Sequence, residues 1–495
     1  MMTGFEKIVE ESLYDIWAKK EFKNPLVTNS YDEIEVLHPG EINSETSGPD
    51  FTNAKIRIGN LVYIGDVEID GDIKDWKTHG HNINARYNKV VLHIALNNKF
   101  NHAYVYNREG RKIPSVTLRK NISGDILRRL RLENAEQKQN KNGRLKCGGA
   151  GVPIDFATAE NYVKQLGAQR FNKKINRIFD RLKELSFLRE MNIKEPIIKY
   201  ELTPEFRNKK FSADDFKGRE LWRQTLYEFI FEALGYSHNK AIMRKLARAA
   251  DVEFLSKLPK DGSFVPLAES ALFNIAGLTP DVRALPASET SDYTKQLAKD
   301  WLEIREFYDG EKFDETDWKF FRLRPQNFPT IRIAGGVRFL DELLNKKLIS
   351  IMIKKITEIR KPDILINSLR TLFIVKASGY WHSHYIFDKE SESYINYFVG
   401  ASRADEILIN VIFPFFVLYF DVFGKSNLSK KLIETYSIFK QRSDNRIERT
   451  VAENLGLKEI AKRTIYAQGM IELYRNFCAK ERCLECIIGK NVFGG

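Results

Sequence analysis

One short stretch of this basic chain concentrates acids and histidines. Residues 47–81 read SGPDFTNAKIRIGNLVYIGDVEIDGDIKDWKTHGH, in which several acids alternate with apolar residues. The candidate ligands in the stretch are Asp50, Asp66, Glu68, Asp70, Asp72, Asp75, His79 and His81. Carboxylates hold Mg²⁺ or Mn²⁺, and such a cation activates water and neutralises the charge of a phosphate group. The stretch therefore predicts a divalent-cation site suited to phosphodiester hydrolysis.

A β-hairpin is expected to bring two of these acids together. Residues 54–58 alternate between polar and apolar side chains, Gly59 and Asn60 form a turn, and residues 61–69 alternate less strictly. Asp50 lies at the entry to the first strand and Glu68 near the end of the second. Because antiparallel strands leave a turn side by side, we expect Asp50 and Glu68 to meet and to hold Mg²⁺ or Mn²⁺. Asp66 and Asp70 share the face of Glu68 if the strand is regular.

The elements around this hairpin indicate an α+β core that precedes a mainly α-helical region. Apolar periodicity predicts a helix over 5–17, strands over 34–37 and 89–96, and a short helix over 82–87. With the hairpin, the order is α-β-β-β-α-β. We expect three parts, which are a core over 1–117, a basic linker over 118–154 and a helical region over 155–495. Its expected helices cover 166–185, 221–234, 339–348, 407–420 and 465–477.

The core resembles the PD-(D/E)XK nuclease superfamily, which includes restriction endonucleases. The resemblance rests on Pro49-Asp50, the hairpin, and Gly65-Asp66-Val67-Glu68-Ile69 within the α-β-β-β-α-β order. It implies a restriction-endonuclease-like fold and a metal-dependent nuclease, with Asp50 and Glu68 as metal ligands. The motif lysine would fall at position 70, where this chain has Asp70. Lys74, Lys77 or a histidine would then supply the catalytic cation, or the core would bind nucleic acid without cutting it.

The segment after the hairpin adds candidate catalytic residues. His79 and His81 flank Gly80, and Tyr87 follows within the expected short helix. In exonuclease-like members of the superfamily, a polar residue followed by Tyr at this place positions the DNA backbone, so His79 or His81 with Tyr87 would serve that role. Either histidine could instead act as a general base or a metal ligand. For His93, which alternates with apolar residues, we expect a packing role.

Four cysteines indicate a second metal centre. Cys478, Cys483 and Cys486 follow a C-x4-C-x2-C spacing, and Cys147 stands alone beside two glycines. Three close thiolates and one distant thiolate can ligate Zn²⁺ or a [4Fe–4S] cluster. Some helicase-associated nucleases pin a chain end with such a cluster, and a helicase partner is expected only by that analogy. The alternative is four ordinary thiols.

The net charge of +13 favours an anionic partner, which we expect to be nucleic acid, and DNA rather than RNA. Guanidinium groups bind phosphate oxygens through paired hydrogen bonds. The candidate phosphate-binding residues are Arg128, Arg129 and Arg131 in the linker, and Arg322, Arg324 and Arg332 in the proline-containing segment 321–332, which we expect to be a loop. The alternatives are a solvated helix face for the first group and a helix-capping loop for the second.

No membrane segment is expected. The first residues are amphipathic and acidic and lack an apolar signal-peptide core, and the apolar stretch 407–420 is short for a span and contains Asn410 and Pro414. We therefore expect a cytoplasmic protein with a buried helix over 407–420.

Taken together, GPDF, GDVEI, DW followed by HGH, and the cysteine-rich tail resemble an uncharacterised family of bacterial-type proteins without an assigned function. The first functional hypothesis is a metal-dependent nuclease. The second is a non-catalytic nucleic-acid-binding protein with a degenerate nuclease core. The third is another kind of hydrolase with a metal site built on His79 and His81.

Overall fold

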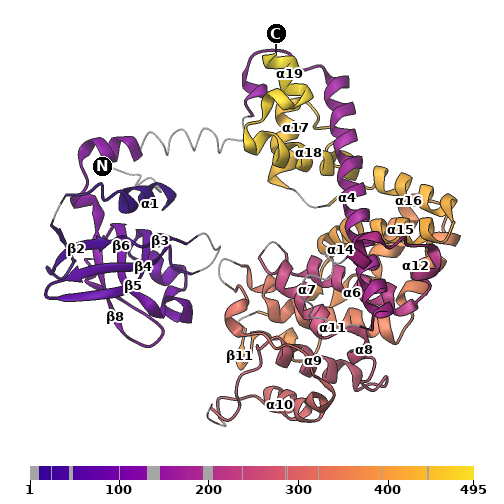
Figure 1. Cartoon of the computed structure of the whole chain (residues 1–495), viewed down its shortest axis with the longest axis horizontal. Coiled ribbons are helices and arrows are strands. Elements are labelled where there is room, and N and C mark those ends of the chain that lie inside the picture. The colour runs from indigo at the N-terminus through magenta and orange to yellow at the C-terminus, as the bar shows by residue number, and fades with distance from the viewer. Residues whose placement is uncertain are drawn as a thin grey trace. The chain divides into compact units, whose positions relative to one another are not determined.

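The computed structural model divides the chain into two compact units, residues 1–143 and residues 144–495. It describes residues 10–23, 25–43, 48–99, 101–130, 145–192, 204–236, 238–284, 286, 288–320, 323–391, 393–442 and 445–494. The first unit carries a mixed β-sheet and the second is mainly helical (Figure 1). The expected class, an α+β part followed by a helical part, is therefore confirmed at this level.

The sheet of the first unit has the strand order β1-β2-β4-β5-β6-β8-β7, with β3 paired to β4. Strands β2, β4 and β5 are antiparallel neighbours, whereas β5, β6 and β8 run parallel. The strands are β1 (Leu26–Val27), β2 (Glu33–His38), β3 (Glu41–Ile42), β4 (Phe51–Ile58), β5 (Leu61–Asp72), β6 (Val90–Asn97), β7 (Tyr104–Tyr106) and β8 (Lys112–Thr117). Strand β5 thus lies in the middle of the sheet.

The central strands are covered on both faces, and the two faces differ. Val67 and Ile69 of β5 belong to an apolar cluster with Leu13, Ile16 and Trp17 of helix α1 (Glu10–Ala18). The opposite face carries the alternating polar residues of β5 and a smaller apolar cluster formed by Ile73, Trp76, Tyr87, Val90, Ala95, Val105 and Ile113. Because side chains alternate along a strand, the same stretch builds a core on one side and a polar cluster on the other.

A β-bulge in β4 sets which residues face each other across the hairpin. Ala54 pairs with Gly65, but the register shifts before Phe51, which pairs with Val67. Asn53 lies in the bulge with φ of 56°, a conformation that asparagine adopts more readily than most residues. A regular ladder would place Phe51 beside Glu68. The shift brings Asp50 beside Glu68 instead.

The second unit is built around the long helix α4 (Phe156–Glu190). This helix packs against α18 (Thr464–Asn476), α15 (Phe413–Val422) and α6 (Arg219–Leu234). The remaining helices of eight or more residues are α7 (Lys240–Ala249), α9 (Phe264–Ile275), α10 (Asp292–Ile304), α11 (Pro329–Leu344), α12 (Leu348–Glu358), α13 (Pro362–Thr371), α16 (Ser426–Ile438) and α17 (Arg446–Leu455). The last helices, from α17 to α19 (Ile487–Phe493), lie at one end of α4 (Figure 1).

The apolar stretch 407–420 is a buried helix, as expected. It runs from α14 (Ala401–Ile407) through a π-helical turn (Leu408–Ile412) into α15, and Pro414 lies in the first turn of α15. Within the described residues, no helix is long and apolar enough to cross a membrane.

Three expectations about elements were wrong, and two strands were missed. The helix expected over 339–348 is divided, because α11 ends at Leu344 and α12 begins at Leu348. The segment 321–332 is not a loop throughout, because α11 begins at Pro329, where the missing N–H of proline costs nothing. Instead of one helix over 82–87, the chain forms helix α2 (Asp75–Thr78) and two 3₁₀ turns, η1 (His81–Ile83) and η2 (Ala85–Lys89). Strands β7 and β8 were not expected, although they extend the sheet on the β6 side.

Helices α4 and α18 approach each other so closely that only glycine fits at the crossing. A Cβ on Gly167 would lie 1.9 Å from the carbonyl oxygen of Ile465, and a Cβ on Gly469 would lie 1.9 Å from that of Val163. Both contacts are with backbone atoms, which cannot move aside as a side chain can. The two glycines therefore set the distance between the first and the last long helix of the unit.

We expect the substitution Gly167→Ala to destabilise the helical unit by roughly 1–3 kcal/mol, because the added methyl group forces the two helices apart. Denaturant unfolding of the full chain measures this loss. The matched control is Gly262→Ala, where an added Cβ would meet nothing within 4 Å. Equal stability of the two variants would contradict the close crossing.

Candidate functional site

Glu68, Asp70 and His81 form the candidate metal site of the first unit. One ligand atom from each lies within 4.8 Å of the other two, and all three side chains are buried. The Nδ1 atom of His81 is 3.3 Å from a carboxylate oxygen of Glu68 and 3.8 Å from one of Asp70. Glu68 and Asp70 are two positions apart on β5 and so point to the same face. Among the described residues, no other trio of histidine, cysteine or acidic side chains meets this spacing.

Asp70, at the position of the motif lysine, is bound by histidines. Its Oδ1 atom lies 3.0 Å from Nδ1 of His79, and its Oδ2 atom lies 3.1 Å from Nε2 of His93. His93 lies on β6 beside Glu68 and also contacts the Ser115 hydroxyl at 3.2 Å. Burial opposes the ionised form of Asp70, but hydrogen bonds from His79 and His93 lower its pKa below the usual range. Asp70 is thus held as an anion.

Asp50 borders this site and is fixed by three hydrogen bonds. Its backbone N–H donates to Glu68 Oε2 at 3.0 Å, and its Oδ2 atom accepts the backbone N–H of Ile69 at 2.8 Å. The Tyr14 hydroxyl on α1 donates to its Oδ1 atom. Asp50 and Glu68 therefore meet, as the hairpin predicted. The trio with metal-ligand spacing, however, consists of Glu68, Asp70 and His81.

Aromatic rings cover the site on the face of the sheet opposite helix α1. The His81 imidazole stacks on the ring of Tyr87, with centroids 4.1 Å apart and an angle of 8°. Trp76 contacts both rings edge to face and also packs on His93. The Tyr87 hydroxyl donates to the carbonyl oxygen of Gly48 at 3.2 Å. Tyr87 and Trp76 therefore orient the histidines and exclude water from one side of the carboxylates.

The close carboxylates are electrostatically unfavourable without a cation. Burial raises the pKa of Glu68 well above its ordinary value, and the nearby charges of Asp50 and Asp70 raise it further. Burial also raises the pKa of Asp66, which accepts the backbone N–H of Asn53 at 3.3 Å. A divalent cation among Glu68, Asp70 and His81 would remove the repulsion that raises the pKa of Glu68. The donor set therefore fits such an ion.

The two candidate catalytic lysines do not pair with the acids of the site. Lys74 and Lys77 are exposed, and within the part of the chain that the structure describes neither forms an ion pair with Glu68 or Asp70. His79 is the histidine of the site with the most exposed side chain, at 16% of its maximal area.

Two side chains, those of His93 and Tyr14, make contacts in the site that the sequence did not predict. His93 was expected to pack, and it also binds Asp70. Tyr14 had not been singled out. Its place in an amphipathic helix gave no chemical signal. For His93 the local pattern indicated only packing, because the parallel pairing of β6 with β5, which places His93 beside Glu68, is not visible in the sequence.

The four cysteines come together in the second unit. The turn at Cys147–Gly149 contacts α19, and Lys146 forms an ion pair with Glu481 at 2.8 Å. Burial raises the pKa of the Cys478 thiol to about 12, and the nearby thiolates of the other three cysteines, Cys147, Cys486 and Cys483, raise it as well. The distant cysteine therefore joins the C-x4-C-x2-C triplet.

The arginines that were candidates for phosphate binding have different surroundings. Arg332 is buried within α11, where it donates to Asn327 Oδ1 at 2.6 Å, to the Tyr236 hydroxyl at 2.9 Å and to the carbonyl oxygen of Phe398. These contacts favour the structural alternative for Arg332. Arg324 and Arg128 are exposed, and Arg129 pairs with Glu21. The remaining two candidates, Arg131 and Arg322, lie outside the described residues.

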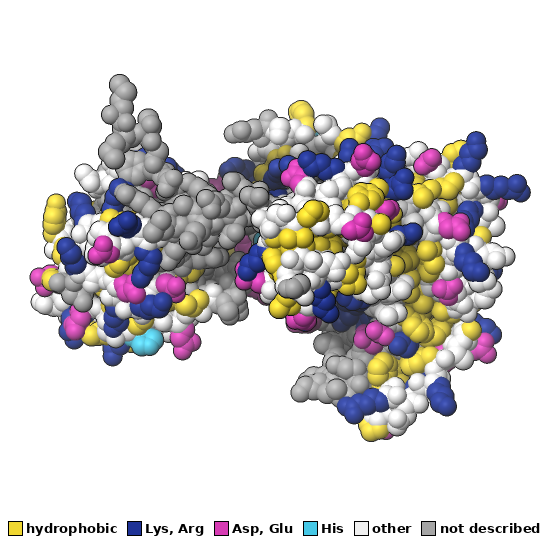
Figure 2. Space-filling model, turned by 90° about the horizontal axis from the view of Figure 1, so that it is seen from above, with side chains coloured by type: hydrophobic (Ala, Val, Ile, Leu, Met, Phe, Trp, Pro, Cys, Tyr) yellow, Lys and Arg dark blue, Asp and Glu magenta, His cyan; other side chains and the backbone are white. Residues whose placement is uncertain are grey.

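The positive charge of the chain is widely distributed on the surface. Figure 2 shows Lys and Arg side chains over the face that it draws, with acidic and apolar side chains between them. Net charge alone therefore does not locate a surface that would bind an anionic partner.

We expect Glu68→Gln to remove a Mn²⁺-dependent rise in melting temperature. Because the folded state raises the pKa of Glu68, its ionised form opposes folding at neutral pH, so the neutral amide should also raise the melting temperature of the metal-free protein by a few degrees. Scanning calorimetry with and without Mn²⁺ measures both effects. Glu33→Gln, at an exposed acid of β2, is the control. An unchanged Mn²⁺ response in Glu68→Gln would exclude Glu68 as a ligand.

Comparisons with curated proteins and with solved structures find no match. One family model does match, over residues 10–194 and 208–445, and it is described as a protein of unknown function (DUF2851). The matched ranges include the candidate metal site and most of the helical unit. They confirm the resemblance of the chain to an uncharacterised family. The chain belongs to this family, DUF2851, whose function is unknown.

Proposed function

We propose that the first unit is a divalent-metal-dependent nuclease of the PD-(D/E)XK type that cleaves phosphodiester bonds in DNA or RNA. The observation that carries this proposal is the buried trio of Glu68, Asp70 and His81 beside Asp50. The element order supports it, since α1, β2, β4, β5, the α2 region and β6 follow the α-β-β-β-α-β order of that superfamily. The proposal includes the restriction-endonuclease-like fold.

The donor set favours Mn²⁺ over Mg²⁺. Two carboxylates suit either ion, but an imidazole ligand is softer than the oxygen ligands that Mg²⁺ prefers. The bound cation would activate a water molecule and neutralise the charge of the scissile phosphate. Glu68, Asp70 and His81 would hold it, and Asp50 would fix the orientation of Glu68 through the hydrogen bond from its backbone N–H.

The aspartate at the lysine position is compatible with catalysis if His79 accepts the proton. Asp70 contacts Nδ1 of His79 at 3.0 Å, which orients the imidazole and stabilises its protonated form. His79 is also the most accessible of the site's three histidines to a substrate. The Asp70–His79 pair would therefore replace the motif lysine in proton transfer. Lys74 is exposed, and among the described residues it forms no ion pair with Glu68 or Asp70, so it is the second choice for this role.

We expect Mn²⁺-dependent cleavage of single- or double-stranded DNA or RNA by the full chain. His79→Asn should reduce the rate by roughly 10²–10⁴-fold, the usual contribution of a general base, and Glu68→Gln should abolish cleavage. Lys74→Ala should reduce it by no more than about threefold, since removing a solvated charge perturbs the site only slightly. Gel assays on labelled oligonucleotides measure all three.

Other results would favour other functions. Loss of cleavage in Lys74→Ala with full activity in His79→Asn would assign the proton transfer to the lysine. Salt-sensitive binding without cleavage by the wild type would favour the non-catalytic alternative.

We also propose that the four cysteines hold a [4Fe–4S] cluster rather than Zn²⁺. Tetrahedral Zn²⁺ with bonds of about 2.3 Å holds its thiolates about 3.8 Å apart. Among the described residues, no three cysteine sulfurs lie within 4.8 Å of one another, although the four thiols are close enough to raise the pKa of Cys478. A larger iron–sulfur cube needs this wider spacing. The cluster would tie residue 147 to residues 478–486.

Protein purified without oxygen should contain iron and acid-labile sulfide and absorb visible light. Cys147→Ser should lose most of the iron and lower the melting temperature, because the loop closed by the cluster is long. Elemental analysis of the same sample measures zinc. Stoichiometric zinc without sulfide would contradict the cluster, and neither metal would assign four ordinary thiols.

A further inference from the structure

A cavity of about 400 Å³ in the helical unit has seven cationic side chains in its lining. Helix α4 contributes four of them, Arg170, Lys173, Lys174 and Arg177, which recur at three- and four-residue spacing on one helix face. The other three come from the starts or ends of α7, α14 and α18 and are Lys240, Arg403 and Arg475. Against these seven cations the lining has three acids, Glu232, Glu406 and Glu448.

Part of this positive charge is neutralised within the chain. Glu472 pairs with Arg170 and Lys173, and Glu232 pairs with Arg177 at 2.6 Å. Arg403 pairs with Glu406 at 2.5 Å. These ion pairs offset part of the repulsion among the cations that line the cavity.

Three further cations form no ion pair with an acid among the described residues. Lys240 and Arg475 make no side-chain hydrogen bond or ion pair with any residue that the structure describes, and Lys174 only donates to Gln468 Oε1 at 2.8 Å. Burial lowers the pKa of Lys174 well below its ordinary value, and the charge of Arg170 adds to this. Desolvation lowers the pKa of Lys240. The charge of Glu232 opposes this shift, and the charges of Arg475, Arg177 and Arg403 add to it. The chain therefore holds like charges together at a cost in stability.

The cavity also has donors without acceptors. The Nε atom of Arg403 and the Nε2 atom of Gln441 are buried, and neither has a hydrogen-bond partner among the described residues. Both residues line the cavity. A buried donor without a partner is unfavourable, and here both donors would be satisfied by the oxygen atoms of an anion.

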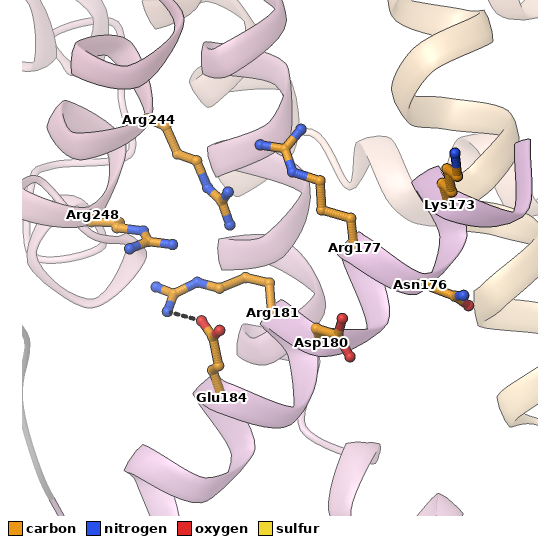
Figure 3. A pocket seen from close by; sticks show the side chains of 8 residues that line it. All are labelled: Lys173, Asn176, Arg177, Asp180, Arg181, Glu184, Arg244 and Arg248. Carbon is orange, nitrogen blue, oxygen red and sulfur yellow. Dashed lines mark hydrogen bonds and ion pairs between the residues drawn. The ribbon is translucent and has the colours of Figure 1, made fainter. Parts of the chain in front are cut away.

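A second cavity of about 330 Å³ continues the positive surface along α4. It shares Lys173 and Arg177 with the first cavity and adds Arg181, Arg244 and Arg248. Figure 3 shows Arg181 extending from α4 toward Arg244 and Arg248, with Glu184 beside it. These three arginines converge on the buried carboxylate of Glu228. Glu184 also pairs with Arg181 at 3.0 Å. The lining holds five cations against two acids, Asp180 and Glu184, so this region stays positive.

We propose that these joined cavities bind a ligand with several phosphate groups, either a nucleotide or the backbone of a nucleic-acid strand. A single phosphate would not use cations spread from Arg170 to Arg181, a rise of about 16 Å along an α-helix. The first cavity has the volume of a small-molecule site. It also has side-chain amides from Asn410, Gln441 and Asn445 and the ring of Phe229, which suit a base. The proposal concerns the second unit and does not depend on cleavage by the first.

The test uses the full chain in EDTA, so that the acidic site of the first unit cannot contribute through a metal. The variants are Lys240→Gln and Arg475→Gln, because neither substitution breaks an ion pair. The matched control is Lys245→Gln, which makes the same charge change on an exposed position of α7 outside the cavities. The probes are inorganic triphosphate, ATP and a labelled single-stranded oligonucleotide. Calorimetry and fluorescence anisotropy measure their binding.

We expect the wild type and Lys245→Gln to bind at least one probe alike, and each cavity variant to bind it roughly tenfold more weakly, the effect of one lost charge-assisted contact. Lys240→Arg should restore binding. Without a ligand, both Gln variants should melt at the same or a higher temperature than the wild type, because they relieve repulsion, which also shows that they fold.

Binding of triphosphate and ATP that the oligonucleotide cannot displace would identify a nucleotide site. Oligonucleotide binding that ATP cannot displace would identify a strand site. No binding of any probe by the wild type, or equal binding by the cavity variants and the control, would overturn the proposal.

Discussion

Two carboxylates buried side by side on β5 are the constraint around which the first unit is arranged. Glu68 and Asp70 occupy alternate positions of a central strand that is covered on both faces, so neither can turn to water. Burying an unpaired charge is costly, and here the compensation comes from histidines on three different segments. Three features position the acids and histidines of this cluster. The bulge in β4 aligns Asp50, Tyr87 stacks on His81, and β6 pairs in parallel with β5. Under the proposed function, the affinity for a cation offsets the cost of this cluster.

Local sequence patterns predicted the elements of this unit better than the contacts between them. Strict alternation over residues 54–58 and the Gly59–Asn60 turn predicted the hairpin, and the approach of Asp50 to Glu68 followed from it. The role of Asp70 could not be read from its position, because a departure from a motif does not say what replaces the missing lysine. Its partner His79 follows a short helix and its partner His93 lies on β6, where the parallel register with β5 brings it to the same carboxylate. Alternation on β6 suggested packing for His93, and that was true of its burial but not of its chemistry.

In the helical unit, the spacing of apolar residues located α4, α6 and α18, but long-range contacts decided the character of single residues. Arg332 was expected to bind phosphate from a proline-containing loop. Instead, Pro329 begins helix α11, and Arg332 is buried within that helix. Basic residues also recur along one face of α4, and a charged helix face is most often simply solvated. What separates a solvated face from a lined cavity is the set of helices that pack around it, and no local pattern reports that.

The crossing of α4 and α18 has a consequence for how the helical unit acquires its structure. Hydrogen bonds from Arg170 to Gln468 and Glu472 join residues about 300 positions apart. During synthesis α4 leaves the ribosome long before α18 exists, so the face that carries Gly167 stays uncovered while the intervening helices emerge. Contacts of such sequence separation slow folding and leave partly formed states exposed to aggregation. The unit should therefore mature after release rather than helix by helix, and a chain that stops short of α18 would leave that face without its partner.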